Sequence, residues 1–593
     1  MAPVAFVGRV AISCCLIFVA LWFFVAEESS PARYKFQGEE HQSHRACSNS
    51  ALAKDDFSWD SISPTEELIW TDCYSDNQCA RLKVPLDYAH PDGGSAAIAM
   101  IRIHSGVPHN SSSYRGPILL NPGGPGGSGV DLVARAGAMI STIVGPAFDI
   151  VGFDPRGIGR STPRVSFFTT RAEREIAFVS DPQFGSMNAS TDALSRAWAR
   201  GILQGQLAGE RDDGSLRFIN TDHTARDMLK IVQAHGHEKL QYWGFSYGSV
   251  LGATFASMFP ENVGRLVIDG VVDSENYFAT EWSNNLLDTE KAWMSFVDGC
   301  VAAGPHGCAF FAPTAAEISS NVDKVYTSLR ERPIPVRTDT SFGVVDYTMV
   351  RATIFRTLYS PYAQFPRLAQ ALADLSQGNG TALFKMFETP VFECACDPSR
   401  FQFESLREAG SAILCNDGKR ISPEYKQVLA HYQNSKTVSD WADVWEFIRM
   451  PCLAWPEFPK THFQGPFIAN TSFPLLLVGN TADPVTPLWA AKKMSQGFAG
   501  SVVLTQDSPG HCSVSAVSLC TQKYIQRYFA DGTLPEPGTV CPVDAPIFPT
   551  SHSAADADVH EQSTFAVSAA DRELFEAVRE LAKTSNFGFP MGI

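Results

Sequence analysis

The segment that most constrains this chain is Gly244-Phe245-Ser246-Tyr247-Gly248, a Gly-x-Ser-x-Gly pattern. A β-type run, Gln241 to Trp243, precedes it, and small residues typical of a helix follow it from Gly248 to Met258. This context predicts a nucleophile elbow, a sharp strand-to-helix turn that lifts the serine Oγ clear of a sheet. The two glycines leave room for the turn, and the helix N-terminus favours negative charge beside the serine. An ordinary glycine-rich turn is the alternative, and the flanking strand and helix argue against it.

The length and charge of the chain limit its class. At 593 residues it exceeds one small core, so a catalytic domain with a large insertion or an extra domain is expected. Hydrophobic residues make up 45% and charged residues 19%, as in folded globular proteins. A formal net charge of -16 argues against nucleic acid as a partner. The same charge is explained by solubility.

The N-terminus is predicted to be a targeting segment. Arg9 precedes an apolar run from Val10 to Ala26, and two glutamates follow. The run is longer than the apolar part of a typical signal peptide, about 7–15 residues, and as short as the shortest membrane-spanning helices, about 17 residues. Entry into the secretory pathway is therefore expected, and a cleaved signal and a single N-terminal membrane anchor both stay open.

Cysteine usage agrees with that compartment. Two of the fourteen cysteines, Cys14 and Cys15, lie in the targeting run, which leaves an even number. In a secretory chain disulfides are expected. In a cytosolic protein Cys394-Ala395-Cys396 would instead suggest a metal site. Local disulfides are predicted for Cys73–Cys79, Cys300–Cys308 and Cys512–Cys520, with a buried free thiol as the alternative for Cys512. Four glycosylation sequons point the same way, at Asn110, Asn188, Asn379 and Asn470.

Apolar runs with the length of buried strands alternate with helical patterns in the first half of the chain. Strands are expected in a hairpin over 79–104 and at 117–121, 148–153, 241–243 and 265–269, and helices at 130–142 and 222–235. This alternation predicts an α/β protein with an open, mostly parallel sheet and right-handed crossovers.

The alternation stops near Ser274 and resumes with strands at 473–478 and 501–505. The residues between are rich in helical and aromatic segments, which predicts a lid inserted above the carboxyl ends of the strands. The expected organisation is a signal peptide or anchor at 1–30, an N-terminal extension at 31–72, the sheet domain at 73–273 and 456–545, a helical lid at 274–455, and a peripheral tail at 546–593 with one amphipathic helix over 569–583.

A serine nucleophile needs a base and an acid that holds the base, and in this fold they follow the serine in the order acid, then histidine. Asp483 and His511 each lie in a loop just after a predicted strand, where a side chain can reach Ser246. Asp269 also ends a strand and is the alternative acid, whereas Asp507 is read as a solvated loop acid. His235 and His237 lie on or after a helix, far from any strand end.

Stabilising an oxyanion requires two backbone N–H donors. One is expected from Tyr247, directly after the nucleophile. The other is expected from the glycine-rich loop after Asn121, where Gly124 is preferred and Gly123 is its neighbour. A phosphate-binding turn is the alternative for this loop, but the Gly-Lys-Ser/Thr pattern is missing.

Several motifs in order resemble the secreted tripeptidyl aminopeptidase-like α/β hydrolases, which are related to prolyl aminopeptidases. The first half carries Asn121-Pro-Gly-Gly-Pro-Gly-Gly-Ser-Gly129, Gly152-Phe-Asp-Pro-Arg-Gly157 and Asp269-Gly-Val-Val-Asp273, and the second carries Asp483-Pro-Val-Thr-Pro487 and Gly510-His-Cys-Ser513. The likeness spans about residues 70–545 and includes the family's TAP-like C-terminal segment. It implies an α/β-hydrolase fold and a serine exopeptidase that removes short peptides from free N-termini, without metal or cofactor.

An exopeptidase of this kind needs a carboxylate for the substrate's α-ammonium group, which the lid is expected to supply. Asp417 is the first candidate because its Cys-x-Asp setting resembles the family's pattern, and Glu393 and Asp397 are the others. Ordinary solvated loop acids are the alternative for all three. Two other functions stay open: an esterase that uses the same triad on a small ester, and a non-catalytic binding module on the same fold.

Overall fold

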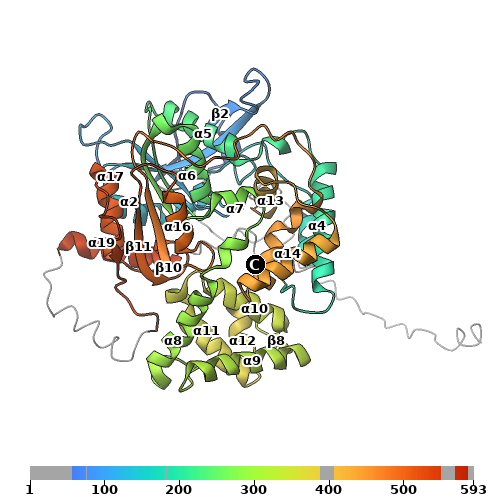
Figure 1. Ribbon diagram of the computed structural model, residues 1–593. Coiled ribbons are helices and arrows are strands. Elements are labelled where there is room, and N and C mark those ends of the chain that lie inside the picture. The colour runs from blue at the N-terminus through green and yellow to red at the C-terminus, as the bar shows by residue number, and fades with distance from the viewer. Residues whose placement is uncertain (1–56, 75, 180–184, 387–405, 549–567, 585–593) are drawn as a thin grey trace, which may run out of the picture. The chain divides into compact units, whose positions relative to one another are not determined.

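The computed structural model describes residues 57–74, 76–179, 185–386, 406–548 and 568–584 (Figure 1). The predicted targeting segment, Cys47, Cys394 and Cys396 therefore lie outside the described residues. No helix among the described residues is long and apolar enough to cross a membrane.

A ten-stranded sheet forms the centre of the described residues, with the strand order β1-β2-β3-β5-β4-β6-β7-β10-β11-β12. The strands from β5 to β12 in this order run parallel, and β1, β2 and β3 join them in antiparallel pairs. The predicted α/β-hydrolase sheet is therefore confirmed. The strands are β1 (Thr71–Cys73), β2 (Asn77–Pro85), β3 (Ser95–Ile103), β4 (Pro117–Asn121), β5 (Asp149–Phe153), β6 (Leu240–Phe245), β7 (Val263–Asp269), β10 (Leu476–Ala482), β11 (Val502–Pro509) and β12 (Val540–Cys541).

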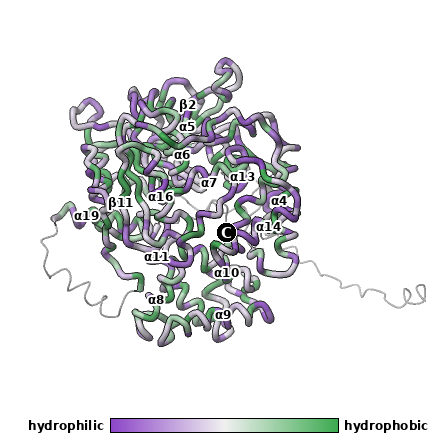
Figure 2. The backbone as a smooth tube through the Cα atoms, in the orientation of Figure 1, coloured by the Kyte–Doolittle hydropathy of each residue, from purple (hydrophilic) through white to green (hydrophobic). Residues whose placement is uncertain are grey.

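Alternate residues of the central strands belong to two hydrophobic cores, one on each face of the sheet, because successive side chains of a strand point to opposite faces. Tyr242 and Ile268 belong to one core and Trp243 and Val267 to the other. Figure 2 shows hydrophobic colour along the strands around β11. Helices α5 (Thr221–Ala234), α6 (Tyr247–Met258) and α16 (Leu488–Ser495) contribute to the first core, and α2 (Gly129–Val144), α17 (Leu519–Asp531) and α19 (Ala569–Thr584) to the second.

The tail helix was expected to be peripheral, but it is part of the second core. Leu574, Val578 and Leu581 of α19 are buried there beside α2 and α17. Lys523 of α17 and Asp571 of α19 form an ion pair of 2.6 Å. The amphipathic pattern of the tail therefore serves packing against the sheet domain.

The segment between β7 and β10 is mostly helical, as expected, and it includes a short hairpin that the sequence did not indicate. Figure 1 shows α9, α11, α12 and the hairpin grouped together in yellow-green. The hairpin strands are short, and Phe342 and Val344 are exposed on one of them, so they lack the pattern of buried strands. The segment contains α7 (Ser274–Phe278), α8 (Thr289–Gly307), α9 (Ala315–Glu331), β8 (Ile334–Arg337), β9 (Phe342–Val345), α10 (Tyr347–Thr357), α11 (Pro361–Ser376), α12 (Thr381–Met386), α13 (Leu406–Asp417), α14 (Tyr425–Val438), α15 (Ala442–Trp445) and the 3-10 helix η6 (Glu446–Ala454). Helices α3 (Arg171–Val179) and α4 (Ala193–Glu210) precede α5.

Two predicted disulfides are confirmed, and one prediction is wrong. Cys73–Cys79 and Cys300–Cys308 are bonded, but Cys520 pairs with Cys541 of β12. Cys512 is a buried free thiol whose Sγ lies 3.5 Å from the carbonyl oxygen of Asp269. The prediction relied on nearness in sequence, but Sγ of Cys512 contacts the end of β7, whereas Cys520 lies in the first turn of α17 and is bonded to β12. A further bond, Cys415–Cys452, joins α13 to η6.

Candidate active site

Ser246 occupies the turn between β6 and α6 with φ 58° and ψ -121°, values that a non-glycine residue rarely adopts. Its N–H donates to the carbonyl oxygen of Asp269 at 2.9 Å, which ties the turn to the neighbouring strand. The flanking glycines are sterically required. A Cβ on Gly244 would lie 2.5 Å from the Gly248 carbonyl oxygen, and one on Gly248 would lie 2.9 Å from that of Asn121.

His511 and Asp483 lie together, each in the loop after its strand. Nδ1 of His511 is 3.0 and 3.1 Å from the two carboxylate oxygens of Asp483, and both side chains are almost fully buried. The N–H groups of Val485, Thr486 and Cys512 also donate to the carboxylate. Burial alone would raise the pKa of Asp483, but the His511 imidazole and these hydrogen bonds hold that pKa below its ordinary value.

Two further residues position His511. The N–H of His511 donates to the carbonyl oxygen of Tyr359 at 2.9 Å, and the two rings meet edge to face. Oγ1 of Thr486 lies 3.2 Å from Nδ1 of His511. Sequence reasoning missed both residues. Thr486 stands in the Asp483-Pro-Val-Thr-Pro487 motif, which could have drawn attention to it, whereas nothing in the sequence places Tyr359 of the inserted segment near His511.

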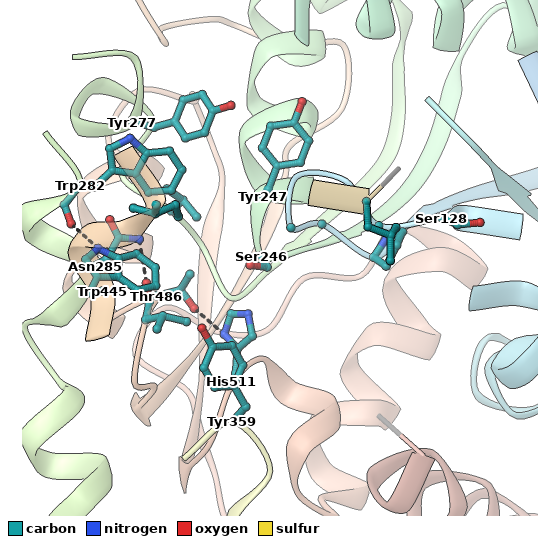
Figure 3. A pocket seen from close by; sticks show the side chains of 18 of the residues that line it. Ser128, Ser246, Tyr247, Tyr277, Trp282, Asn285, Tyr359, Trp445, Thr486 and His511 are labelled. Atoms are coloured by element: carbon teal, nitrogen blue, oxygen red, sulfur yellow. Dashed lines mark hydrogen bonds between the residues drawn. The ribbon is translucent and has the colours of Figure 1, made fainter. Parts of the chain in front are cut away.

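Ser246 and His511 both line one cavity of about 340 Å³ (Figure 3). The glycine-rich loop after β4 forms part of its wall. The inserted segment adds an aromatic wall that includes Tyr277, Trp282 and Trp445. Trp282 has φ 57°, and its carbonyl oxygen accepts the indole N–H of Trp445 at 3.0 Å. The structure thus brings the predicted nucleophile and base to one pocket, and the predicted acid is bonded to the base beneath its surface.

The two expected N–H donors also border this cavity. Tyr247 opens α6, where the first backbone N–H groups of a helix have no intrahelical acceptor. The N–H of Gly123 already donates to the side chain of Asn121 at 2.9 Å, which favours Gly124 over Gly123 as the second donor. Gly123 is needed for space, because a Cβ there would lie 2.2 Å from the carbonyl oxygen of Phe245.

The structure places Asp417 behind the cavity wall. Its side chain is fully buried and accepts hydrogen bonds from the N–H and Oγ1–H of Thr221 and from the hydroxyl of Tyr277. Burial raises the pKa of Asp417 above its ordinary value, against the opposing effect of His462 and these hydrogen bonds. Asp417 was expected to reach into the cleft and bind a substrate's α-ammonium group, so this buried position differs from the expected one. Glu393 and Asp397 lie outside the described residues.

Two groups among the described residues bring three possible metal-ligating atoms within 4.8 Å of one another. One is Asp483, His511 and Cys512. The other is His104, His109 and Asp149, next to the start of β5 and so away from the carboxyl ends of the parallel strands. In both groups the carboxylate already accepts hydrogen bonds from backbone N–H groups, so both are explained as hydrogen-bond networks.

Comparisons with known proteins agree with this geometry. A family model for the α/β hydrolase fold matches residues 116–303, and one for TAP-like proteins matches residues 437–541. The tripeptidyl aminopeptidase of Streptomyces coelicolor is 29% identical over 485 residues, covering 78% of this chain and 84% of the relative. The serine protease Hip1 of Mycobacterium tuberculosis is 27% identical, covering 80% and 90%. Carboxylesterase B of the same species is 28% identical, covering 78% and 86%. The predicted resemblance is confirmed.

Proposed function

Because this chain is a serine hydrolase of the α/β-hydrolase fold, homologous to tripeptidyl aminopeptidases, we propose that it releases short peptides from the free N-termini of peptide substrates. One observation supports the catalytic part most strongly. A serine in a strained elbow and a histidine bonded to a buried aspartate line the same cavity.

In this proposal Ser246 Oγ attacks the scissile carbonyl while Nε2 of His511 takes its proton. Asp483 keeps the proton of the imidazole on Nδ1 and stabilises the imidazolium that forms. The N–H groups of Tyr247 and Gly124 stabilise the oxyanion. His511 then protonates the departing amine, which leaves an acyl-enzyme, and the same base activates the water that hydrolyses the ester.

Selection of a free N-terminus requires a carboxylate near the end of the cavity. Among the described residues that line it, Asp131 is the only carboxylate, and it forms a 2.6 Å ion pair with Arg160. A paired carboxylate attracts an ammonium group less strongly than an unpaired one. We therefore keep Glu393 as the candidate acceptor of the α-ammonium group, with Asp131 as its competitor.

Product analysis on unblocked peptides of varied length tests the proposal. Release of one short N-terminal fragment per cycle is expected, and N-acetylation of a good substrate should remove most of its turnover. Glu393→Gln and Asp131→Asn form a matched pair, since each removes the charge of one candidate. The variant that lowers cleavage of the free peptide far more than cleavage of the acetylated peptide identifies the acceptor. Equal cleavage of blocked and unblocked peptides would rule out the aminopeptidase.

That last outcome would favour an esterase, the second candidate, which is supported by the relative named carboxylesterase B. A panel of small esters separates the two activities. A non-catalytic binding module is the third possibility, and labelling of Ser246 by a fluorophosphonate probe excludes it.

We also propose that the protein enters the secretory pathway. Four disulfides among the described residues fit an oxidising compartment, and the asparagines of all four sequons are exposed. Sequencing the N-terminus of the mature protein distinguishes a cleaved signal peptide from a retained membrane anchor.

A further inference from the structure

One carboxylate that the proposed mechanism does not use lies directly beneath the catalytic residues. Asp269 is the last residue of β7, and its side chain is fully buried. Its carbonyl oxygen accepts the N–H of Ser246 at 2.9 Å and lies 3.5 Å from Sγ of Cys512. The main chain of Asp269 therefore contacts both the nucleophile and the residue that follows the histidine.

The side chain of Asp269 holds the loop that carries His511. Oδ1 accepts the N–H of Ser513 at 2.8 Å, and Oδ2 accepts its Oγ–H at 2.5 Å. The indole N–H of Trp243 in β6 also points at Oδ2, at 3.3 Å. Because Ser513 is two residues after His511, the carboxylate fixes the C-terminal side of the histidine loop. Asp483 holds the same loop at two other points, the imidazole Nδ1 of His511 and the backbone N–H of Cys512.

The space between this strand end and the histidine is already filled. Gly270 follows Asp269 with φ 64°, and a Cβ there would lie 2.4 Å from Sγ of Cys512 and 3.4 Å from Cε1 of His511. A loop packed this closely cannot relax towards β7 when one of its hydrogen bonds is lost. A shift of the loop would instead move the imidazole relative to Ser246.

We propose that Asp269 is a positioning residue, which fixes His511 relative to Ser246 by tying the histidine loop to the strand end that also holds the nucleophile. The inference rests on the proposed function, since it takes Ser246 and His511 as the reacting pair. Asp269 was also the alternative candidate for the triad acid. The inference gives it a different role, because Nδ1 of His511 is bonded to Asp483.

The ionised form of Asp269 accepts all three hydrogen bonds, whereas protonation turns one oxygen into an O–H donor and weakens it as an acceptor. The titratable groups that interact with it are Asp483 and the thiol of Cys512. Burial, opposed by the hydrogen bonds from Ser513 and Trp243 and reinforced by Asp483, raises the pKa of Asp269 to about 6. Protonation in mild acid therefore disturbs the anchor at a pH where the protein is still expected to be folded.

The test compares the wild type with Asp269→Asn, Ser513→Ala and Asp507→Asn. Asp507 is the matched control, an exposed carboxylate on β11 that accepts from Thr481. The readouts are kcat and KM on a peptide and the rate constant of fluorophosphonate labelling from pH 4.5 to 8. Asp269→Asn should lower kcat and the labelling rate about 10- to 100-fold, as expected for a displaced catalytic group, and leave KM within about threefold. Ser513→Ala should act in the same direction and less strongly, and Asp507→Asn should have no effect.

The pH profile supplies a readout that a purely structural role would not move. In the wild type the acid limb should be steeper than one protonation allows, and in Asp269→Asn it should fit one protonation. An unchanged labelling rate and acid limb in Asp269→Asn would overturn the inference. So would a loss as large as that of Asp483→Asn, which would make Asp269 the triad acid.

Two complications are covered by the same measurements. If Asp269→Asn fails to fold, Ser513→Ala decides, since a lowered labelling rate supports the anchor and an unchanged rate overturns it. If the wild type cleaves no peptide but is labelled, the peptidase proposal fails, and the labelling rates still test the role of Asp269.

Discussion

The hydroxyl group of Tyr277 donates a 2.8 Å hydrogen bond to Oδ2 of Asp417. Tyr277 lines the active-site cavity, whereas Asp417 lies behind it on α13. The same carboxylate accepts two hydrogen bonds from Thr221, whose Oγ1 lies 2.5 Å from the hydroxyl of Tyr247. Figure 3 shows that this hydroxyl points away from Ser246. Asp417 thus joins the inserted segment to the cavity wall and to the helix that follows the nucleophile.

The first prediction concerns this buried carboxylate. Asp417→Asn places an amide N–H₂ among hydroxyl groups that now donate to the carboxyl oxygens of Asp417, so the free energy of unfolding should fall by about 1–3 kcal/mol. Turnover of a free peptide and of its N-acetyl analogue should change by the same factor. Denaturant unfolding and kcat/KM on both peptides check this, with Glu331→Gln, at the exposed end of α9, as control. A selective loss on the free peptide would instead show that Asp417 binds the α-ammonium group.

The second prediction concerns the triad. Ser246→Ala and His511→Ala should abolish turnover, and Asp483→Asn should lower kcat about 10⁴-fold, because the imidazole then loses the partner that fixes its tautomer. Circular dichroism should show that Ser246→Ala remains folded, since it removes one oxygen from a preformed turn. Substantial activity in His511→Ala would contradict the assignment.

The sheet, and the positions of the proposed catalytic residues at strand ends, could be predicted because their signals are local. The Gly-x-Ser-x-Gly motif needs only its own neighbours to specify the elbow, and Asp483 and His511 each follow a recognisable buried strand. The fold therefore brings together three residues whose separate contexts already indicated a strand end.

The partners of buried polar groups could not be predicted in the same way. Asp417 carries a family-like local pattern, but its burial depends on Thr221 and Tyr277, which lie far away in sequence. Cys512 is close to Cys520 in the chain, yet Cys512 is buried against Asp269 while Cys520 is bonded to Cys541. Such outcomes depend on tertiary packing, which a local pattern does not contain.

The third prediction concerns the cysteines. Peptide mapping without reduction should find Cys415–Cys452 and Cys520–Cys541, and Cys512 should be alkylated only after unfolding. Burial, reinforced by Asp269 and Asp483, raises the pKa of the Cys512 thiol well above its ordinary value, so the reactive thiolate is scarce as well as inaccessible. Fast modification of Cys512 by iodoacetamide in the native protein would show that the loop opens.

The fourth prediction is a pH dependence of stability. The pKa of Asp269 rises from 3.8 to about 6 on folding, so between these values the native state binds more protons than the unfolded state. Stability from this group is therefore present at low pH and lost as pH rises through about 6. Relative to Asp269→Asn, the wild type should lose up to about 3 kcal/mol between pH 4 and pH 7.5. Denaturant unfolding of both proteins at the two pH values measures the change, and a constant difference would show that Asp269 does not titrate there.

The fifth prediction concerns α19, which lies beyond the segment that matches the TAP-like family. Val578 of α19 is buried in the same core as Cys512 and Val514, which lie one and three residues after His511. Val578→Asp buries an unpaired charge and should lower the free energy of unfolding by about 3 kcal/mol or more. Because the helix supports the histidine loop, fluorophosphonate labelling should also slow at temperatures well below the melting point. Glu580→Ala, which removes only an exposed ion pair with Lys583, is the control. Labelling at the wild-type rate in folded Val578→Asp would mean that α19 stabilises the domain without positioning His511.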